Sequence, residues 1–300
     1  MNSSRHLLRW LLGGIVLAGA TACSGDDSAP EPTDGVKVRR LTITQTDDNA
    51  ATRATLTEDD GLSASWTKND ALTYCNLSRA QQGDDVTPYS GRLTAASTAV
   101  VSQFTGDVVC RNGDYLAVVY PAATFTTNSQ YTIALSGQDG TLAGLATNYH
   151  FVYGKALVNS VTDGAAKATM PKMKSLLTVC KFSFVNKDGG AAIPIKTLTI
   201  SYGASSSDVG KYPQTATVSI GVNTAQADVH ATGATATEPL TVNCTTTQEA
   251  VYVALLPTAA ERTFSFSVTD GSGNTYTGTA KATLAEGEYM EATKLKLTKQ

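Results

Sequence analysis

The residues of this chain that could perform acid–base or nucleophilic chemistry are few and widely spaced. After residue 22 there are two histidines, His150 and His230. His230 lies among small polar residues, which is typical of a solvated face or a loop, and His150 follows a Gly- and Ala-rich stretch. The short motifs of hydrolases, zinc proteases and phosphate-binding loops are not found. Because Ser–His chemistry needs a base beside its nucleophile, we expect no enzyme, no catalytic residue and no cofactor.

Three acidic segments have oxygen ligands that a metal ion could use. The segment from Asp270 to Asn274 resembles the beginning of a calcium loop, but the distal Glu that would complete the loop is missing. We therefore predict a hairpin turn there and no metal site. The segments from Glu58 to Gly61 and from Gly83 to Asp85 are likewise predicted to be turns.

Cys23 is the residue with the clearest chemical role. Residues 1–22 have a basic beginning, a short apolar core and the small residues Ala20, Thr21 and Ala22 before the Cys, which is the pattern of a signal peptide. Small residues followed by Cys resemble the bacterial lipobox, in which that Cys is acylated and becomes the first residue of the mature chain. An ordinary secretory cut after Ala22 is the alternative. We expect lipidation at Cys23, because two or more acyl chains, at about 0.8 kcal/mol per buried CH₂, anchor a protein stably to a membrane.

The segment after Cys23 is expected to be a disordered linker over residues 23–35, because it is rich in Asp and Pro. The acidic pair Asp26 and Asp27 resembles the surface-export signal of Bacteroidota lipoproteins, although it also fits a plain solvated linker. This resemblance implies a surface-exposed protein of the outer membrane.

Four cysteines remain, and their wide spacing excludes a C-x-x-C metal or redox pair. They are Cys75, Cys110, Cys180 and Cys244. Disulfides are permitted outside the cytoplasm, and a Cys180–Cys244 bridge is conceivable. We expect instead that all four are free, buried and inert.

Composition and periodicity together predict an all-β protein. Charged residues make up 16% of the chain and the net charge is −3, with no basic patch for nucleic acid. Thr, Val and small residues dominate, which favours strands over helices. The segment Tyr115–Tyr120 is apolar on both faces, which indicates a central strand. Residues 134–153 are predicted to be a long loop, and Trp66 is predicted to lie in a core rather than on a glycan-binding surface.

The mature chain is long enough for two domains. We place the junction at the turn from Thr162 to Gly164, which gives an N-terminal β-sandwich over 36–165 and a C-terminal one over 166–300. Alternating apolar residues predict a first strand over 36–43 and seven further strands in the second half. The second-half strands contain Phe182, Ile200, Val218, Val242, Val253, Phe266 and Leu297.

Four segments, in this order along the chain, resemble the fimbrillin family of Bacteroidota, the subunits of type V pili. They are Thr52–Leu56 with Ser65–Leu72, then Tyr115–Ala122, Lys174–Asn186 and Leu284–Tyr289. The Trp66 signature departs from the family in having Asn69 where Gly is usual. The resemblance implies two transthyretin-like β-sandwich domains, lipoprotein export, processing after Arg53, and assembly with other pilus subunits by strand donation.

Two functions remain open at the level of the sequence. The first is a structural or adhesive pilus component; because no spare donor strand follows Leu297, we expect a tip, anchor or accessory subunit rather than a shaft subunit. The alternative is a stand-alone surface-exposed lipoprotein that binds a glycan or a host protein. For either function, a further partner could be a ligand on a host or bacterial surface.

Overall fold

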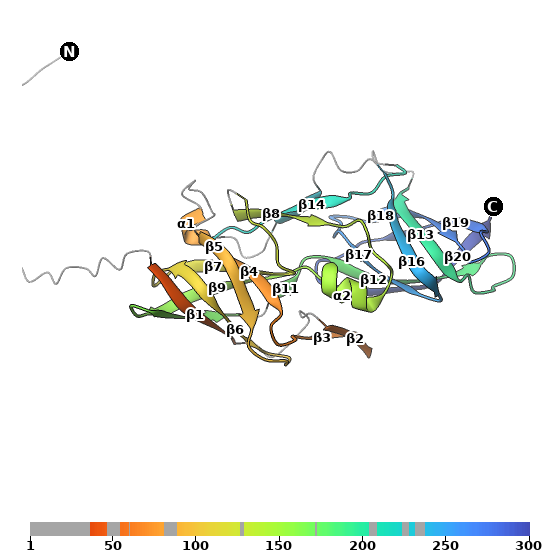
Figure 1. Ribbon diagram of the computed structural model, residues 1–300. Coiled ribbons are helices and arrows are strands. Elements are labelled where there is room, and N and C mark those ends of the chain that lie inside the picture. Colours follow the sequence, from red (N-terminus) through yellow and green to blue (C-terminus); the bar gives the residue numbers. More distant parts are fainter. Residues whose placement is uncertain are drawn as a thin grey trace, which may run out of the picture. The chain divides into compact units, whose positions relative to one another are not determined.

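Strands make up most of the residues that the structure describes, as the composition predicts (Figure 1). A computed structural model describes residues 37–46, 55–59, 61–80, 89–126, 129–171, 173–203, 209–223, 228–231 and 238–300. Gly35–Gln300 is one compact unit. No helix among these described residues is long and apolar enough to cross a membrane.

The first sheet contains eight described strands in the order β10-β1-β6-β5-β4-β7-β9-β11. β9 also pairs with β10, so the sheet closes on itself. Its strands are β1 (Lys37–Gln45), β4 (Ala71–Asn76), β5 (Ser90–Ala95), β6 (Gln103–Cys110), β7 (Tyr115–Tyr120), β9 (Val152–Val161), β10 (Ala165–Met170) and β11 (Lys174–Ser175). The short helix α1 (Leu77–Ala80) follows β4.

The closed sheet encloses its own apolar core, in which Trp66 is fully buried. The indole ring meets Phe104 and Tyr120 edge-on, with ring centroids 5.0 and 5.5 Å away, an arrangement that aromatic quadrupoles favour. The predicted core position of Trp66 is confirmed. Asn69, with φ 73°, lies in the turn before β4, where the Gly of the resembled signature would be unstrained.

β7 has the two-sided burial that its sequence predicts. Leu116 and Val118 face the core inside the first sheet, while Ala117 and Val119 face a second core on its other side. β4 pairs with one edge of β7, and β9 pairs with the other. β7 is therefore a central strand, as expected.

The second sheet contains seven described strands in the order β16-β13-β18-β19-β20-β12-β17. These are β12 (Thr178–Asn186), β13 (Ile195–Tyr202), β16 (Leu240–Gln248), β17 (Val251–Leu255), β18 (Arg262–Thr269), β19 (Thr275–Ala282) and β20 (Tyr289–Lys299). In each of the two large sheets the first described strand is parallel to one that lies near the end in sequence: β1 pairs with β10, and β12 pairs with β20. The side chains that the sequence assigns to the inner face of β12 and β18, including Phe182, Phe184 and Phe266, are buried.

Two smaller sheets complete the described fold. β2 (Thr55–Asp59) and β3 (Gly61–Ser65) form a hairpin. β8 (Gln130–Ala134), β14 (Thr215–Ser219) and β15 (Asp228–Ala231) form a sheet in which β14 lies in the middle. Because β8 comes from the first half of the chain and β14 from the second, this sheet joins the halves through backbone hydrogen bonds.

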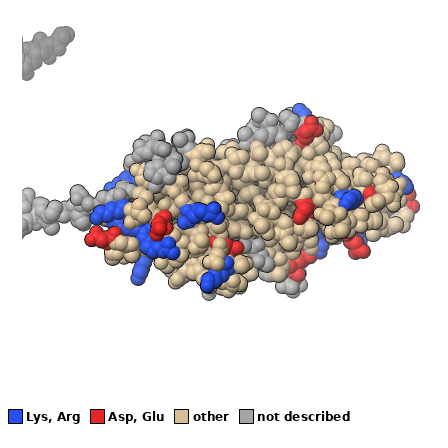
Figure 2. All heavy atoms as spheres, in the orientation of Figure 1, with Lys and Arg blue, Asp and Glu red and all other residues tan. Residues whose placement is uncertain are grey.

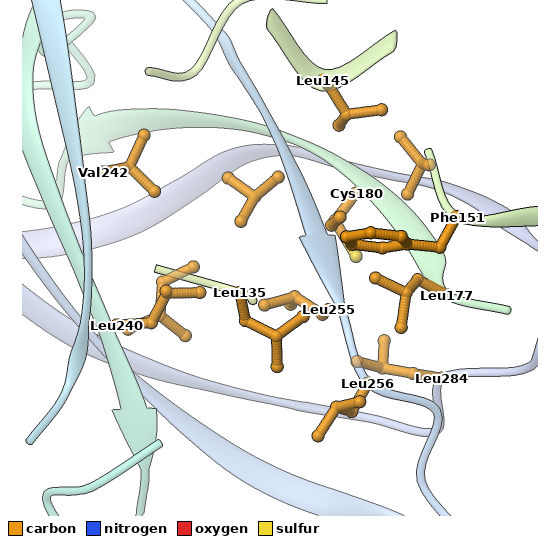
Figure 3. Close-up of a cluster of buried hydrophobic side chains, with 14 of the residues drawn as sticks. Leu135, Leu145, Phe151, Leu177, Cys180, Leu240, Val242, Leu255, Leu256 and Leu284 are labelled. Carbon is orange, nitrogen blue, oxygen red and sulfur yellow. The ribbon is translucent and has the colours of Figure 1, made fainter. Parts of the chain in front are cut away.

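One apolar cluster spans the two halves. It combines the second sheet with β8 and with residues after β8, as Figure 3 shows for Leu135, Leu145, Phe151, Cys180 and Leu255. The side chains of Leu135, Cys180 and Leu255 are at most 1% exposed. Burial on this scale contributes about 1.5–3 kcal/mol per large side chain, so the halves are held together by packing as well as by the β8–β14 pairing.

The prediction of a long loop over 134–153 is wrong in part, because this segment contains a short helix, α2 (Leu142–Asn148). Thr141 caps it: its Oγ1 accepts a hydrogen bond from the Gly144 N–H at 2.9 Å, and Asp139 in turn accepts from the Thr141 N–H and hydroxyl. Leu and Ala favour the helix, whereas Gly144 and the length of only seven residues do not; the Thr cap supports the first turn, and Leu145 and Ala146 pack inward.

The turn from Thr162 to Gly164, which we predicted as a domain junction, connects β9 and β10, two paired strands of the first sheet. The chain remains in that sheet until Ser175 and enters the second sheet at Thr178. Measured by sheet membership, the transition lies about ten residues after the predicted boundary at 165–166.

Candidate functional site: the seat of the first strand

The strand β1 is held on both edges. Lys37–Thr44 runs antiparallel to Gln103–Cys110 of β6, and Arg40–Gln45 runs parallel to Ala165–Met170 of β10. Leu41 and Ile43 point into the core of the first sheet and are fully buried. We call this slot between β6 and β10 the seat of β1. The predicted first strand over 36–43 is confirmed for its described residues.

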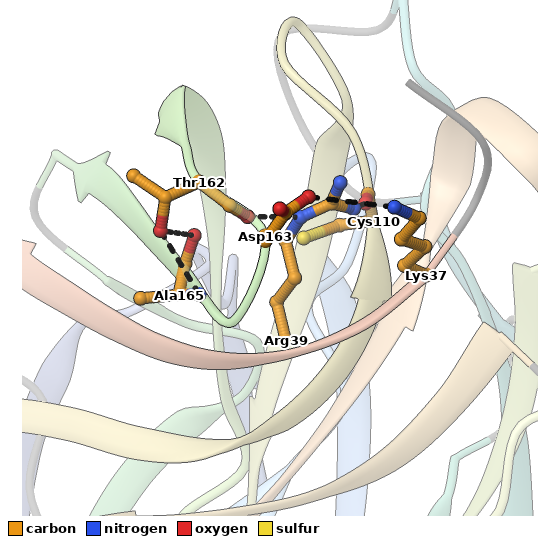
Figure 4. Close-up of polar contacts among 6 residues, drawn as sticks. All are labelled: Lys37, Arg39, Cys110, Thr162, Asp163 and Ala165. Carbon is orange, nitrogen blue, oxygen red and sulfur yellow. Dashed lines mark hydrogen bonds and ion pairs between the residues drawn. The ribbon is translucent and has the colours of Figure 1, made fainter. Parts of the chain in front are cut away.

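Arg39 fixes the beginning of β1 with its side chain (Figure 4). It is 1% exposed, although Arg is rarely buried unless its donors are satisfied. Its Nε donates to the carbonyl oxygen of Thr162 at 2.9 Å, and its guanidinium also donates to the carbonyl oxygen of Cys110. These carbonyls belong to the turn after β9 and the end of β6, so Arg39 ties both walls of the seat together.

The other cations of β1 are bound much more loosely. Lys37 Nζ lies 3.4 Å from Asp163, and an Arg40 nitrogen lies 3.4 Å from Asp107. All four side chains are more than half exposed, and such surface pairs contribute about 0–1 kcal/mol each. On the face drawn in Figure 2, Lys and Arg are interspersed with Asp and Glu over the first sheet.

The backbone of the Thr162–Ala165 turn completes the seat. Thr162 Oγ1 accepts from the Ala165 N–H at 3.2 Å, and the Arg40 N–H donates to the carbonyl oxygen of Gly164 at 3.0 Å. If β1 left its seat, the facing edges of β6 and β10 would lose their ladder bonds, and the core around Leu41 would open to water. Vacating the seat therefore creates a groove that another strand of similar pattern can fill.

Two predicted site residues, Cys23 and Arg53, lie outside the described residues. The competing arginines for processing, Arg39 and Arg40, lie within β1 and are paired with neighbours on one or both sides. A protease needs an extended, accessible segment, so the structure favours neither as a cleavage site in the folded chain.

The two histidines lie in different parts of the described fold. His150 is only 3% exposed, and its backbone N–H donates to the carbonyl oxygen of Leu145, so it belongs to the packing after α2 rather than to an open loop. His230 lies in strand β15 opposite Thr217, where the sequence suggested a loop or a solvated face. Among the described residues, no three His, Cys, Asp or Glu side chains are grouped so that they could hold a metal ion.

The four cysteines are free and buried, as predicted. Burial raises the pKa of Cys75 and of Cys180 to about 12, and it also raises the pKa of Cys244. Since the thiolate is the reactive form, these thiols are inert at neutral pH.

Of the three acidic segments, the hairpin turn from Asp270 to Asn274 is confirmed. Asp270 Oδ1 accepts from the Ser272 and Asn274 N–H groups at 2.8 and 2.9 Å, and Oδ2 accepts from Asn274 Nδ2 and the Tyr276 hydroxyl. Both carboxylate oxygens of Asp270 therefore accept hydrogen bonds from the turn and from Tyr276 just after it. The segment from Gly83 to Asp85 lies outside the described residues.

Glu58 has a role that the sequence did not reveal. Its carboxylate accepts hydrogen bonds from Lys181, Tyr252 and Tyr289, which lie on β12, β17 and β20. These bonds lower the pKa of Glu58 to about 2, the bond from Lys181 contributing most. We call this group the Glu58 clasp. Sequence reasoning missed it because nothing in a local pattern links residue 58 to partners more than 120 positions away.

No protein-family model matches the chain, and no curated protein matches it in sequence. Among solved structures, it is similar to a "putative cell adhesion protein" from Bacteroides ovatus ATCC 8483, with a TM-score of 0.51 and 12% identity over 88% of this chain and 96% of that one. Another, described in the same words, from Bacteroides eggerthii DSM 20697, matches with a TM-score of 0.39 and 14% identity over 87% and 86% of the two chains. The first of these similarities shows a shared fold.

Proposed function

We propose that this protein is a structural or adhesive component of a fimbrillin-like pilus on the surface of a bacterium, and not an enzyme. It is exported as a lipoprotein, anchored to the outer membrane through acyl chains on Cys23, and built from two transthyretin-like β-sandwich domains. Its partners are other pilus subunits. The fold shared with the Bacteroides ovatus protein supports this proposal, together with the four segments that resemble fimbrillins.

The observation that carries the proposal is the position of β1. It is the first described strand, it lies between β6 and β10 in the closed first sheet, and it precedes the segment that contains Arg53. A cut after Arg53 would free β1 from its covalent connection to the rest of the fold, leaving only its seat to hold it. A donor strand from another subunit could then replace β1 between β6 and β10.

The deciding experiment is mass spectrometry of the mature N-terminus on intact cells. Pilus assembly predicts two species, a lipidated chain that begins at Cys23 and a processed chain that begins at Ala54. Arg53→Ala should abolish the second species, whereas Arg40→Ala should leave it unchanged.

A stand-alone surface lipoprotein is the second candidate, and the Glu58 clasp is the observation that favours it. A hairpin bound to the second sheet by three side chains stabilises the intact chain without any need for processing. If only the lipidated species is found, and Arg53→Ala has no effect on what the cells display, this candidate replaces the pilus component.

A further inference from the structure

The strands β19 and β20 are neighbours in the second sheet, but they pair at one end only. Tyr276 pairs with Lys299 and Thr277 with Thr298, and the Gln300 N–H donates to the carbonyl oxygen of Thr275 at 2.9 Å. The same register, continued, would place Ala280 opposite Leu295. Within residues 238–300, all of which the structure describes, no such pair forms.

The strands diverge immediately after Gly278. A Cβ at Gly278 would lie 3.0 Å from the carbonyl oxygen of Lys296, so the strands are in close contact at this point. Beyond it, β19 continues to pair with β18 as far as Ala282, opposite Arg262. β20 continues to pair with β12 back to Tyr289, opposite Val179. Each strand therefore turns one unpaired edge toward the other across the opening.

The opening leads to an apolar cavity of about 110 Å³. Its walls are mostly apolar side chains from β12, β18, β19 and β20 and from residues beside them: Cys180, Phe182, Leu255, Phe264, Phe266, Ala280, Ala282, Leu284, Met290, Ala292 and Leu295, with Lys281 also present. Ala280, Met290, Ala292 and Leu295 are only partly buried, whereas Tyr276 and Leu297 at the paired end are 9% and 1% exposed. Apolar surface is thus left uncovered where the pairing stops.

The last hairpin of the first sheet shows the contrast. There β9 and β10 pair along their length: Leu157 lies opposite Thr169 at one end and Val161 opposite Ala166 at the other, with a bulge between. Ala166, Ala168 and Met170 of β10 are at most 3% exposed. The corresponding last hairpin of the second sheet, β19 and β20, is paired only at the end that lies away from its connecting residues 283–288. The gap is therefore a local feature of β19 and β20 rather than a general property of this architecture.

We propose that the gap between β19 and β20 accepts an extended strand from another polypeptide, one with small apolar residues at alternate positions. Two facing strand edges present N–H and C=O groups on both sides, and an extended backbone is the ligand that satisfies both rows at once. Alternate side chains of that strand point inward. The cavity is smaller than the engineered cavity of about 150 Å³ that holds benzene, so it fits side chains of the size of Ala or Val.

This acceptor site is separate from the seat of β1 and requires no cut after Arg53. The inference does not rest on the proposed pilus function, because it concerns open edges in the intact chain. A negative result in the test below would leave the mass-spectrometric test of processing unaffected, and the reverse also holds.

The first measurement is amide hydrogen exchange of the full-length protein alone. The amides of Thr279–Ala282 and Met290–Leu295 that point into the gap should exchange at least tenfold faster than those of the paired ends, Tyr276–Thr277 and Thr298–Lys299. Equal protection of both regions would mean that the strands are closed, and would overturn the proposal.

The second measurement uses a fluorescein-labelled peptide with the sequence Gln214–Gly221. Its Ala216, Val218 and Ile220 alternate with Thr and Ser, and they are buried in their own strand and the residue after it. The labelled peptide should raise the fluorescence anisotropy on binding and should protect the amides of the gap. The same peptide with Val218 replaced by Asp is the matched control and should not bind.

Filling the cavity should block the site. Ala292→Leu, or Ala280→Leu on the opposite strand, should weaken peptide binding at least tenfold, while Thr298→Ala at the paired end should leave it unchanged. Both filling variants should keep the wild-type circular dichroism spectrum, and either alone suffices for the test. Binding that protects β6 and β10 instead, or that survives both filling variants, would overturn the proposal.

Discussion

Glu58 and Lys181 join a hairpin near the beginning of the fold to β12 and β17, the strand pair at one edge of the second sheet. Lys181 Nζ donates to Glu58 Oε1 at 2.6 Å, and the two side chains are 22% and 21% exposed. Lys181 lies on β12 directly opposite Tyr252 of β17, whose hydroxyl donates to the other oxygen of the same carboxylate. Leu56, two residues before Glu58, is buried in the cluster that spans both halves. The β2–β3 hairpin is thus bound through one apolar and one ionic side chain.

Glu58→Gln should destabilise the protein by about 1–2 kcal/mol at pH 7, because charge-assisted hydrogen bonds are stronger than neutral ones. Urea unfolding measures the difference. Glu261→Gln is the control, since Glu261 lies 3.6 Å from Lys281 and both side chains are more than half exposed; it should change stability by less than about 0.5 kcal/mol. An equal effect of the two substitutions would show that the clasp contributes no more than a surface pair.

The stabilisation by Glu58 should also depend on pH in a defined window. Its pKa is lowered from 4.5 to about 2 in the folded protein, so the unfolded chain binds the proton first as the pH falls. The contribution is therefore complete above pH 4.5 and is lost progressively toward pH 2. The stability difference between wild type and Glu58→Gln should shrink across this window. A difference that stays constant from pH 6 to pH 2 would contradict the assignment.

The sequence predicted the positions of individual strands better than it predicted which strands pair with one another. The alternation in β12, β13 and β18 and the two-sided pattern of Tyr115–Tyr120 identified strands whose side chains are buried as expected, because period-2 patterning is a local property. Closure of the first sheet through β9 and β10 depends on pairing between distant residues, which no local pattern encodes. The same reason explains why the Glu58 clasp and the bonds of Arg39 were found only in the structure. The helix α2 was missed because it is only seven residues long and contains Gly144, so it shows no extended helical pattern.

Arg39→Met should destabilise the protein by about 2–3 kcal/mol. The substitution keeps an apolar stem but leaves the buried carbonyls of Thr162 and Cys110 without their donor, and a hydrogen bond to a charged group contributes about 1.5–3 kcal/mol. Arg40→Met is the matched control one residue away, with a side chain 60% exposed, and should shift stability by less than about 0.5 kcal/mol. Thermal unfolding of the two variants side by side tests this. Similar losses of stability in both variants would mean that the side-chain hydrogen bonds of Arg39 add nothing to the backbone hydrogen bonds of β1.

The four cysteines should remain unreactive toward an aromatic disulfide reagent in the native protein at pH 8. All are buried, and burial raises the pKa of Cys75 and Cys180 to about 12. Unfolding in guanidinium chloride should release four reactive thiols after residue 23. If only two thiols react after unfolding, and a non-reducing peptide map contains a disulfide-linked Cys180–Cys244 peptide, the prediction that these cysteines are free is wrong.

Cys23→Ala should release the protein from the membrane fraction of cells. We propose that acyl chains on Cys23 supply the membrane affinity, at about 0.8 kcal/mol per buried CH₂. The released form should keep the wild-type unfolding midpoint, because Cys23 lies before the compact unit that begins at Gly35. Sedimentation of the variant with outer membranes, at the wild-type level, would rule out the lipid anchor.

Limited digestion with an Arg-specific protease tests the processing site on the folded protein. Cleavage is expected after Arg53, whereas Arg39 and Arg40 should resist because β1 is paired with β6 and β10. The cut β1 should stay bound, since Leu41 and Ile43 are fully buried and contribute about 1.5–3 kcal/mol each. Size-exclusion chromatography of the digest followed by N-terminal sequencing would then find both fragments in one peak. Arg53→Ala is the control and should leave the chain intact under the same conditions. Cleavage within β1 or within the second sheet, with Arg53 resistant, would remove the basis for strand exchange and leave the stand-alone lipoprotein as the function.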